Sequence, residues 1–300
     1  MDLPTENSNS QPDVIQPNIM SPNPLSKYFR QPAIFINLPS QGEYWPPGSL
    51  EMPVTNELPV YPMTTKDEVT LKTPDALMNG SGIVEVVQSC CPNILNAWKM
   101  PSIDVDTVLI SIRIASYGNN MDFDTACPHC NEENTYTQDL RACLAGIRKP
   151  NYAELLKITS HNLQIKLRPQ SYFDSNKASK IAVEEQKMLQ ALESTEDATE
   201  VRGAKIQKSM QILVDLALEG MVASTEYILT GDGERVANPV HILEFYKNTD
   251  TTLIKVLQER LAEISEFASI PPMQVTCGSC SQDYKVPIEF NYTSFFGKGS

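Results

Sequence analysis

Four of the seven cysteines form two Cys-x-x-Cys pairs, Cys127 with Cys130 and Cys277 with Cys280. Two intervening residues let the chain turn so that both thiolates of a pair face one ion. Two such pairs supply the four ligands of a tetrahedral structural zinc site. A polar, strand-like run follows each pair, and a hairpin at each pair is the outline of a zinc ribbon. The sequence therefore predicts one structural Zn²⁺ ion, with Cys127, Cys130, Cys277 and Cys280 as its metal ligands.

The two pairs lie unusually far apart, because 146 residues separate Cys130 from Cys277. This length greatly exceeds the usual insert of a ribbon. We interpret the intervening segment as a mainly helical domain inserted between the two halves of the ribbon. In this interpretation the metal joins the two ends of the insert, and closing so long a loop is where a cross-link should matter most.

Two catalytic uses of these cysteines compete with the structural one. Cys-Pro-His-Cys also occurs in disulfide oxidoreductases, where the first thiolate lies at a helix N-terminus. Here a Thr/Tyr run follows, no βαβ pattern is visible, and the second pair would be unexplained. A zinc deaminase needs His-x-Glu and Pro-Cys-x-x-Cys, and neither is present. Four thiolates also leave no open position for a catalytic water. We therefore expect a protein that is not an enzyme.

The remaining cysteines and the histidine of the first pair receive ordinary interpretations. His129 lies inside the first pair and is expected to be a solvent-facing loop residue rather than a ligand. Cys90, Cys91 and Cys143 are expected to be buried structural thiols, the usual state of an unpaired cysteine.

Composition excludes several classes of protein. The 300 residues are 41% hydrophobic and 20% charged, which is typical of a globular chain. The formal net charge of −13 argues against non-specific nucleic-acid binding and against an anionic membrane surface. The sequence contains no run of 18 apolar residues, so no transmembrane helix is predicted. The first residues lack the pattern of a secretory signal. An odd cysteine count does not suit a disulfide framework, so we expect synthesis in a reducing cytoplasm.

Proline and hydrophobic patterning predict the domain organisation. Twelve of the 22 prolines fall in the first 62 residues, where regular helix and central strand are therefore disfavoured. The opening segment is interpreted as a flexible arm, with wrapping around a partner as the alternative. The expected fold class is α+β, with an extended Pro-rich N-terminal arm. The predicted divisions are the arm at 1–32, an α+β region at 33–122, the first half of the ribbon at 123–150, the inserted helical domain at 151–270, and the second half with the C-terminal tail at 271–300.

Periodicity predicts several elements within these divisions. Residues 103–115 are nearly apolar all round, which indicates a buried helix. Its single base, Arg113, is expected to pair with Asp104 or Asp106 at the helix rim. Thr65 is a candidate helix cap, with Glu68 three residues later. Beyond residue 150 the pattern predicts a strand over 161–168, helices over 206–221 and 253–268, a helix beginning at 238–239, and a hairpin that joins 227–229 to 235–236.

Two adjacent phenylalanines, Phe295 and Phe296, lie near the C-terminus. Large aromatic side chains are common anchors at protein interfaces. The pair is interpreted either as folding back on the ribbon or as binding a partner, and the sequence does not choose between these.

Several segments together resemble one known family. They include the run from Phe123 to Leu140, the second cysteine pair, and the ending from Ile288 through Gly297. Shorter matching segments are Leu-Pro-Ser-Gln-Gly at 38–42, Leu-Lys-Thr-Pro-Asp-Ala-Leu at 71–77 and Ile-Ser-Ile-Arg-Ile-Ala-Ser-Tyr-Gly at 110–118. Over roughly residues 33–300, the chain resembles the baseplate hub and hub-assembly proteins of contractile-tailed, T-even-type bacteriophages.

This resemblance implies a structural or assembly component of a tail baseplate hub that acts by protein–protein scaffolding. Implied partners are other hub and wedge proteins of the phage baseplate, with the tape-measure protein as a further candidate. The protein would be made in the host cytoplasm and built into the virion as part of a hetero-oligomeric assembly, with no nucleic acid and no membrane as partner.

The alternative is a zinc-ribbon factor that acts on nucleic acid in transcription or translation. Such a factor needs a basic face on the ribbon. Residues 127–141 contain three acids and one base, and residues 277–290 contain two acids and one base. Neither half is basic, which disfavours this alternative.

Overall fold

A computed structural model describes residues 23–73, 76, 79–148, 150–193, 199–287 and 295–296. The chain divides into two compact units, Met1–Gln31 and Pro32–Ser300. The first unit contains a short 3₁₀ helix, η1 (Ser26–Tyr28), beside which Leu25 and Phe29 are exposed. Residues 1–22, the greater part of the predicted arm, lie outside the described residues, so the prediction of a flexible arm stays untested.

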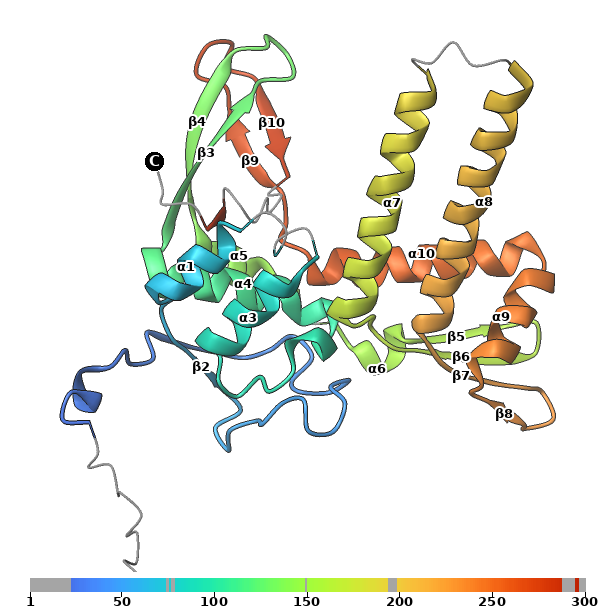
Figure 1. Cartoon of the computed structure of the whole chain (residues 1–300), viewed down its shortest axis with the longest axis horizontal. Helices are drawn as coiled ribbons and strands as arrows, with labels where there is room; N and C mark the ends of the chain where they lie inside the picture. The colour runs from blue at the N-terminus through green and yellow to red at the C-terminus, as the bar shows by residue number, and fades with distance from the viewer. Residues whose placement is uncertain are drawn as a thin grey trace, which may run out of the picture. The chain divides into compact units, whose positions relative to one another are not determined.

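The second unit begins with a small α+β region (Figure 1). A two-stranded antiparallel sheet pairs β1 with β2. Around it lie helices α1 and α3, the 3₁₀ helix η2, and α4. The bounds are β1 (Ile34–Ile36), β2 (Leu58–Val60), α1 (Thr65–Leu71), α3 (Ser81–Cys90), η2 (Ala97–Lys99) and α4 (Ser102–Tyr117).

Helix α4 is buried nearly all round, which confirms the prediction for residues 103–115. Leu109, Ile110 and Ile112 are completely buried, and they belong to the core that this region builds. Ile103, at the start of α4, belongs instead to the core of the following region. Helix α4 therefore contributes side chains to both large cores.

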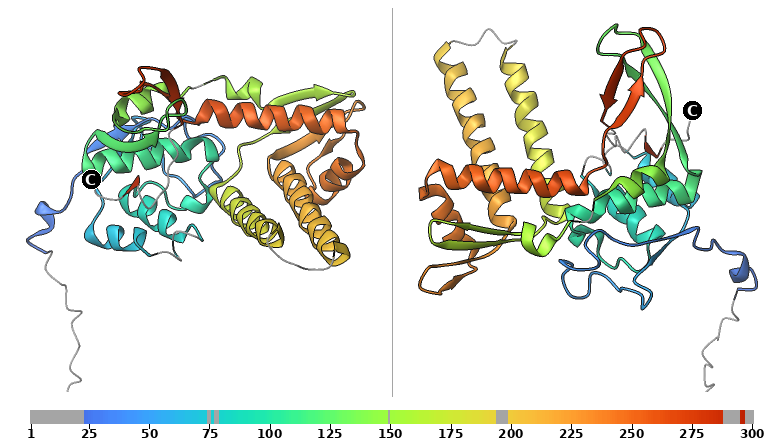
Figure 2. Two further views of the ribbon diagram at one scale, coloured as in Figure 1. Left: turned by 90° about the horizontal axis from the view of Figure 1, so that it is seen from above. Right: turned by 180° about the vertical axis from the view of Figure 1, so that it is seen from behind.

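Two hairpins carry the cysteine pairs. Strands β3 (Asn120–Ala126) and β4 (Glu133–Asp139) form one, and β9 (Met273–Thr276) and β10 (Asp283–Val286) form the other. Strand β4 leads directly into α5 (Leu140–Gly146), where the Asp139 side chain caps the helix N-terminus. The hairpins lie side by side in both figures (Figures 1 and 2).

The segment between the hairpins contains four helices of ten or more residues and a four-stranded antiparallel sheet of order β5-β6-β7-β8. Its core joins the sheet to α9 and α10. The prediction of a mainly helical segment understated this sheet. The bounds are α6 (Tyr152–Leu155), β5 (Lys157–Ser160), β6 (Leu163–Leu167), α7 (Tyr172–Glu193), α8 (Thr199–Ala223), β7 (Thr225–Leu229), β8 (Arg235–Val236), α9 (Pro239–Asn248) and α10 (Thr251–Ala268). Mixed helices and antiparallel sheets confirm the α+β class.

The two ends of this segment meet in space. Arg148 lies 3.1 Å from the Glu266 carboxylate, and its guanidinium lies 4.5 Å from the centre of the Phe267 ring. Gly146 is so close to Pro271 that an added Cβ would lie 2.9 Å from the proline ring. These contacts have the geometry that an inserted segment requires, whereas the exact domain boundaries stay a prediction.

Two local predictions were wrong. Arg113 forms no ion pair within the described residues. It is 2% exposed, lies 4.6 Å from the centre of the Tyr117 ring, and leaves Nε and Nη1 without hydrogen-bond partners. The Asp104 carboxylate accepts hydrogen bonds from Ser40 and Trp45 instead of pairing with Arg113.

The cap of α1 is Thr64 rather than Thr65, because Thr64 and Asp67 exchange side-chain and backbone hydrogen bonds in a capping box.

The buried Asp104 carboxylate fixes the loop that contains the Leu-Pro-Ser-Gln-Gly segment. It accepts hydrogen bonds from Ser40 N at 2.9 Å, Ser40 Oγ at 2.5 Å and Trp45 Nε1 at 2.8 Å. Gln41 and Gly42 in this loop adopt left-handed backbone conformations. The loop is therefore held to the first turn of α4 by one fully buried acid.

This arrangement predicts a specific pH dependence. Burial raises the pKa of Asp104 to about 6, although its hydrogen bonds from Ser40 and Trp45 oppose the shift. Because the folded pKa exceeds the unfolded one, the contribution of the carboxyl to stability is greatest at low pH and is lost as pH rises through about 6. Asp104→Asn removes this titration. The free energy of unfolding of the variant minus that of the unaltered chain should increase by roughly 1–3 kcal/mol as the pH rises from about 4 to about 7.

Urea unfolding of both chains across this pH range measures the difference, and titrations elsewhere in the chain cancel. A difference that does not change with pH would contradict the prediction.

Candidate metal centre

The structure brings the four cysteines of the two pairs into one cluster. Their Sγ atoms all lie within 4.8 Å of one another. Cys127 Sγ is 3.7 Å from Cys280 Sγ, and Cys130 Sγ is 3.6 Å from Cys277 Sγ. Zinc–sulfur bonds of about 2.3 Å in a tetrahedron place sulfurs roughly 3.8 Å apart. The cluster therefore has the size and donor set to hold one metal ion.

Each pair is shaped by the same backbone pattern. The N–H of the first cysteine donates to a carbonyl five residues later, and its carbonyl accepts from the N–H four residues later. Asn131 and Ser281, each directly after the second cysteine of its pair, have φ of 59°. Each turn also directs a backbone N–H, from His129 or Ser279, to the sulfur of the first cysteine at 3.4 Å. The two hairpins therefore present their sulfurs in equivalent ways.

Backbone N–H groups around Cys277 favour the thiolate form of that one side chain. Hydrogen bonds from the Cys280 and Ser279 backbone, the former having the larger effect, lower the pKa of the Cys277 thiol to about 6. Metal binding requires deprotonated sulfur, so a lowered pKa prepares this side chain for an ion at neutral pH.

A small core joins the two hairpins below the cysteines. The Tyr136 hydroxyl of β4 lies 3.0 Å from the Thr276 carbonyl, to which it donates, and 3.2 Å from the Tyr284 hydroxyl. Phe123 packs on Tyr136, and Val275 belongs to the same cluster. Alternation of polar and apolar residues along each strand places these side chains on one face.

Asn134 is a residue that the sequence analysis missed. Its Nδ2 lies 3.6 Å from Cys277 Sγ, and its Oδ1 accepts from Gly278 N at 3.1 Å. It thus connects the first hairpin to the turn of the second. The only sequence signal for this role is the position of Asn134 four residues after Cys130. A single sequence does not show that the side chain contacts the turn at Cys277 and Gly278.

The other predicted residues lie as follows. His129 is exposed, and Cys90, Cys91 and Cys143 are buried outside the cluster, as expected. Phe295 and Phe296 are 3% and 5% exposed, in edge-to-face contact at 4.9 Å. They belong to the core of the N-terminal region rather than to the ribbon. Within this chain they fold back, and partner binding by the pair stays a prediction.

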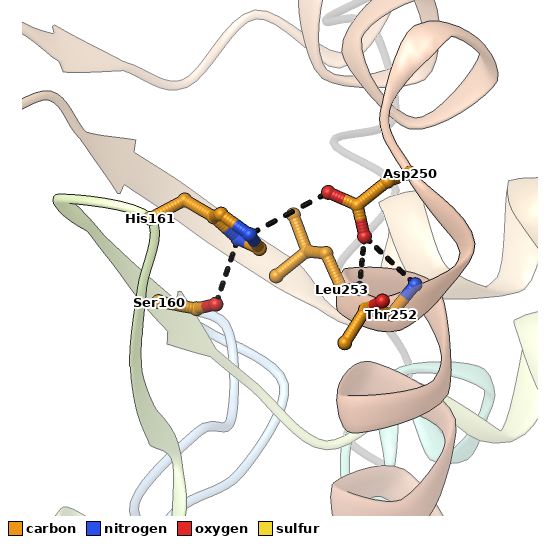
Figure 3. A network of polar contacts seen from close by, with 5 residues as sticks. All are labelled: Ser160, His161, Asp250, Thr252 and Leu253. Carbon is orange, nitrogen blue, oxygen red and sulfur yellow. Dashed lines mark hydrogen bonds and ion pairs between the residues drawn. The ribbon is translucent and has the colours of Figure 1, made fainter.

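A second polar cluster has the residue types of a hydrolytic triad (Figure 3). Ser160 Oγ lies 2.9 Å from His161 Nδ1, and His161 Nε2 lies 3.5 Å from Asp250 Oδ2. The side chains of His161 and Asp250 are about half exposed. Asp250 Oδ1 accepts from the N–H groups of Thr252 and Leu253 and so caps α10. This cluster joins the β5–β6 turn to a helix start, and it lacks the water-excluded environment of a catalytic site.

Within the described part of the chain, no helix is both long enough and apolar enough to span a membrane. The chain matches the family model described as T4 bacteriophage base plate protein over residues 35–297. No similar curated protein and no similar solved structure was found. The match covers both cysteine pairs and the whole segment between them. The chain therefore belongs to the T4 bacteriophage base plate protein family and has a structural role in the phage tail baseplate.

Proposed function

We propose that this protein is a structural or assembly component of the baseplate hub, and that one Zn²⁺ ion bound by the four clustered cysteines holds its two hairpins together. The observation that carries the proposal is the convergence of four sulfurs from segments 146 residues apart, within 4.8 Å. The function is scaffolding: the metal fixes the paired hairpins, and the folded regions present surfaces to hub, wedge and tape-measure proteins.

The donor set supports zinc in a structural role. Four cysteine sulfurs are the ligand set of closed tetrahedral zinc sites, which have no open position for substrate or water. Without an ion, thiolates at 3.6–3.7 Å would repel one another. Zinc would relieve this repulsion and replace it with four bonds.

The charge of the hairpins opposes the nucleic-acid alternative. Alternation along β3 and β4 places Asp122, Asp124, Glu133 and Asp139 on the exposed face. Two of them bind Thr hydroxyls of the neighbouring strand, Asp124 with Thr135 and Asp122 with Thr137. A face with these acids and no base repels phosphate, whereas a protein partner can match it.

Metal removal provides the first prediction. Treating the protein with a strong chelator should release one equivalent of zinc and expose β9 and β10 to hydrogen exchange. A loss of about 4 kcal/mol would lower the melting temperature by roughly 10 °C in a domain of this size. Cys277→Ser should have the same effect without chelator. The measurements are elemental analysis, thermal melting and hydrogen exchange.

His129→Ala is the control, because this exposed residue lies in the turn of the first cysteine pair without belonging to the cluster. It should keep both metal and stability. An unchanged melting curve after chelation, or full metal content in Cys277→Ser, would contradict the zinc proposal.

The hub proposal is tested by quantitative mass spectrometry of density-purified phage particles and of infected-cell lysate. We expect the chain in particles at a fixed ratio to other hub proteins. Detection in lysate alone would identify an assembly factor that leaves before maturation. A ratio to hub proteins that varies between particle preparations would contradict a built-in role.

A further inference from the structure

Strand β1 has a free edge, which is the side of the strand away from β2. Among the described residues it pairs with β2 alone, in a two-stranded antiparallel sheet. In this register Phe35 lies opposite Pro59, which has no backbone N–H. Opposed residues alternate between hydrogen-bonded and non-hydrogen-bonded pairs, so Phe35 and Pro59 form a non-hydrogen-bonded pair. The N–H and C=O of Phe35 therefore point away from β2.

These two backbone groups of Phe35 bond to no other segment in the part of the chain that the structure describes. The Phe35 side chain is 61% exposed, which is unusual for a large aromatic residue in a strand. Strand edges with unpaired N–H and C=O groups are templates for pairing with another chain. The edge of β1 at Phe35 therefore has one donor and one acceptor ready for an added strand.

A cavity of about 430 Å³ lies beside this strand. Residues 33–36 of the β1 segment line it on one side, and Ile114 of α4 with Arg141 and Leu144 of α5 line it on the other. Of the described residues, none of β2 lines it, which places the cavity at the free edge. Its size lies within the usual range of ligand pockets, roughly 300–1,000 Å³, and its lining is apolar except for the arginine.

Arg141 gives this cavity its charge. Among the described residues that line the cavity, it alone is charged. The residue is exposed, and its guanidinium forms no ion pair with the rest of the described chain. Guanidinium groups bind carboxylates strongly, often through two parallel hydrogen bonds. A ligand of this edge therefore needs an aliphatic group for the cavity and a carboxylate for Arg141.

We propose that the free edge of β1 binds an extended segment of another baseplate protein, which joins the sheet as a third strand. The backbone of this segment bonds to the N–H and C=O of Phe35. An aliphatic side chain enters the cavity, and an acidic side chain two residues away binds Arg141. Side chains two residues apart lie on the same face of a strand, so one segment can reach both. In such strand addition, backbone bonds give affinity and side-chain pockets give specificity.

The charge of the site favours a different protein over a second copy of this chain. Two copies could pair their β1 strands edge to edge, yet residues 31–37 contain no acid. Such a pair would leave both Arg141 guanidinium groups without a carboxylate. A partner segment in which acidic and aliphatic residues alternate with others supplies both groups. The site lies outside the metal centre, so neither the proposal nor its test depends on zinc.

Fluorescence polarisation with the full chain tests the proposal. The probe is the labelled peptide Ser-Thr-Glu-Thr-Ile-Thr-Glu-Thr-Ser, whose sequence is the same in both strand directions. Two comparison peptides replace both glutamates by lysine, or the isoleucine by serine. Because the strand is short, we expect a Kd of about 10–500 µM for the glutamate peptide, and at least tenfold weaker binding of the other two. No binding of the glutamate peptide at about 1 mM protein overturns the proposal.

Phe35→Pro tests the backbone bonds. Proline removes the N–H at the free edge and is tolerated on edge strands, so pairing with β2 should be kept. We expect at least a tenfold rise in the Kd of the glutamate peptide. Phe35→Thr is the matched control, because it also removes the ring but keeps the N–H. Its Kd should stay within about fivefold, the most that one cross-strand side-chain pair contributes. Equal effects of the two variants overturn the proposal.

Arg141→Glu tests the charge. The residue is exposed in the first turn of α5, where an acid is favourable, so folding should be kept and circular dichroism checks it. This variant should prefer the lysine peptide over the glutamate peptide by at least about fivefold, and an unchanged preference for glutamate contradicts the proposal. A dimer of the unaltered chain in sedimentation equilibrium that Phe35→Pro abolishes would assign the edge to a second copy and would also overturn it.

Discussion

The meeting of two chain segments 146 residues apart is the constraint on which the architecture depends. Loop closure of this length costs entropy, and the cysteines alone cannot offset it, because close thiolates repel. Contacts below the cluster share the task. Tyr136 reaches the Thr276 carbonyl, Gly146 admits Pro271, and Arg148 pairs with Glu266. The inserted segment is thus held at its ends by protein contacts, and the proposed ion would fix the sulfurs at the top of the hairpins.

Helix α4 connects the two large hydrophobic cores of the second unit. Asp104 in its first turn accepts hydrogen bonds from Ser40 and Trp45 and so holds their loop. Ile103 packs in the core of the segment between the hairpins, whereas the middle of the helix packs in the core of the N-terminal region. Arg113 is an exception to good packing, since a buried guanidinium with unpartnered nitrogens costs stability. Its stacking on Tyr117, which donates to Glu68, offsets only part of that cost.

Charged residues are concentrated on particular faces of the protein, which the net charge alone does not reveal. The net charge of −13 describes the whole chain, yet the outer face of β3–β4 is acidic, whereas the α7–α8 pair combines both signs, as in the ion pair of Lys177 with Glu219. For a baseplate protein such separation is useful, because each surface excludes partners that another accepts.

The sequence by itself determined which four cysteines cluster, the buried character of residues 103–115 and the α+β class, because the spacing of cysteines and hydrophobic periodicity are local properties. It also indicated the phage baseplate family through the order of several short segments. Only the tertiary structure decided which groups donate hydrogen bonds to Asp104, that Arg113 pairs with no acid among the described residues, and that Phe295 and Phe296 lie in the N-terminal core. It also decided the role of Asn134. Each of these depends on which distant segments become neighbours, and one sequence does not encode that in any readable spacing.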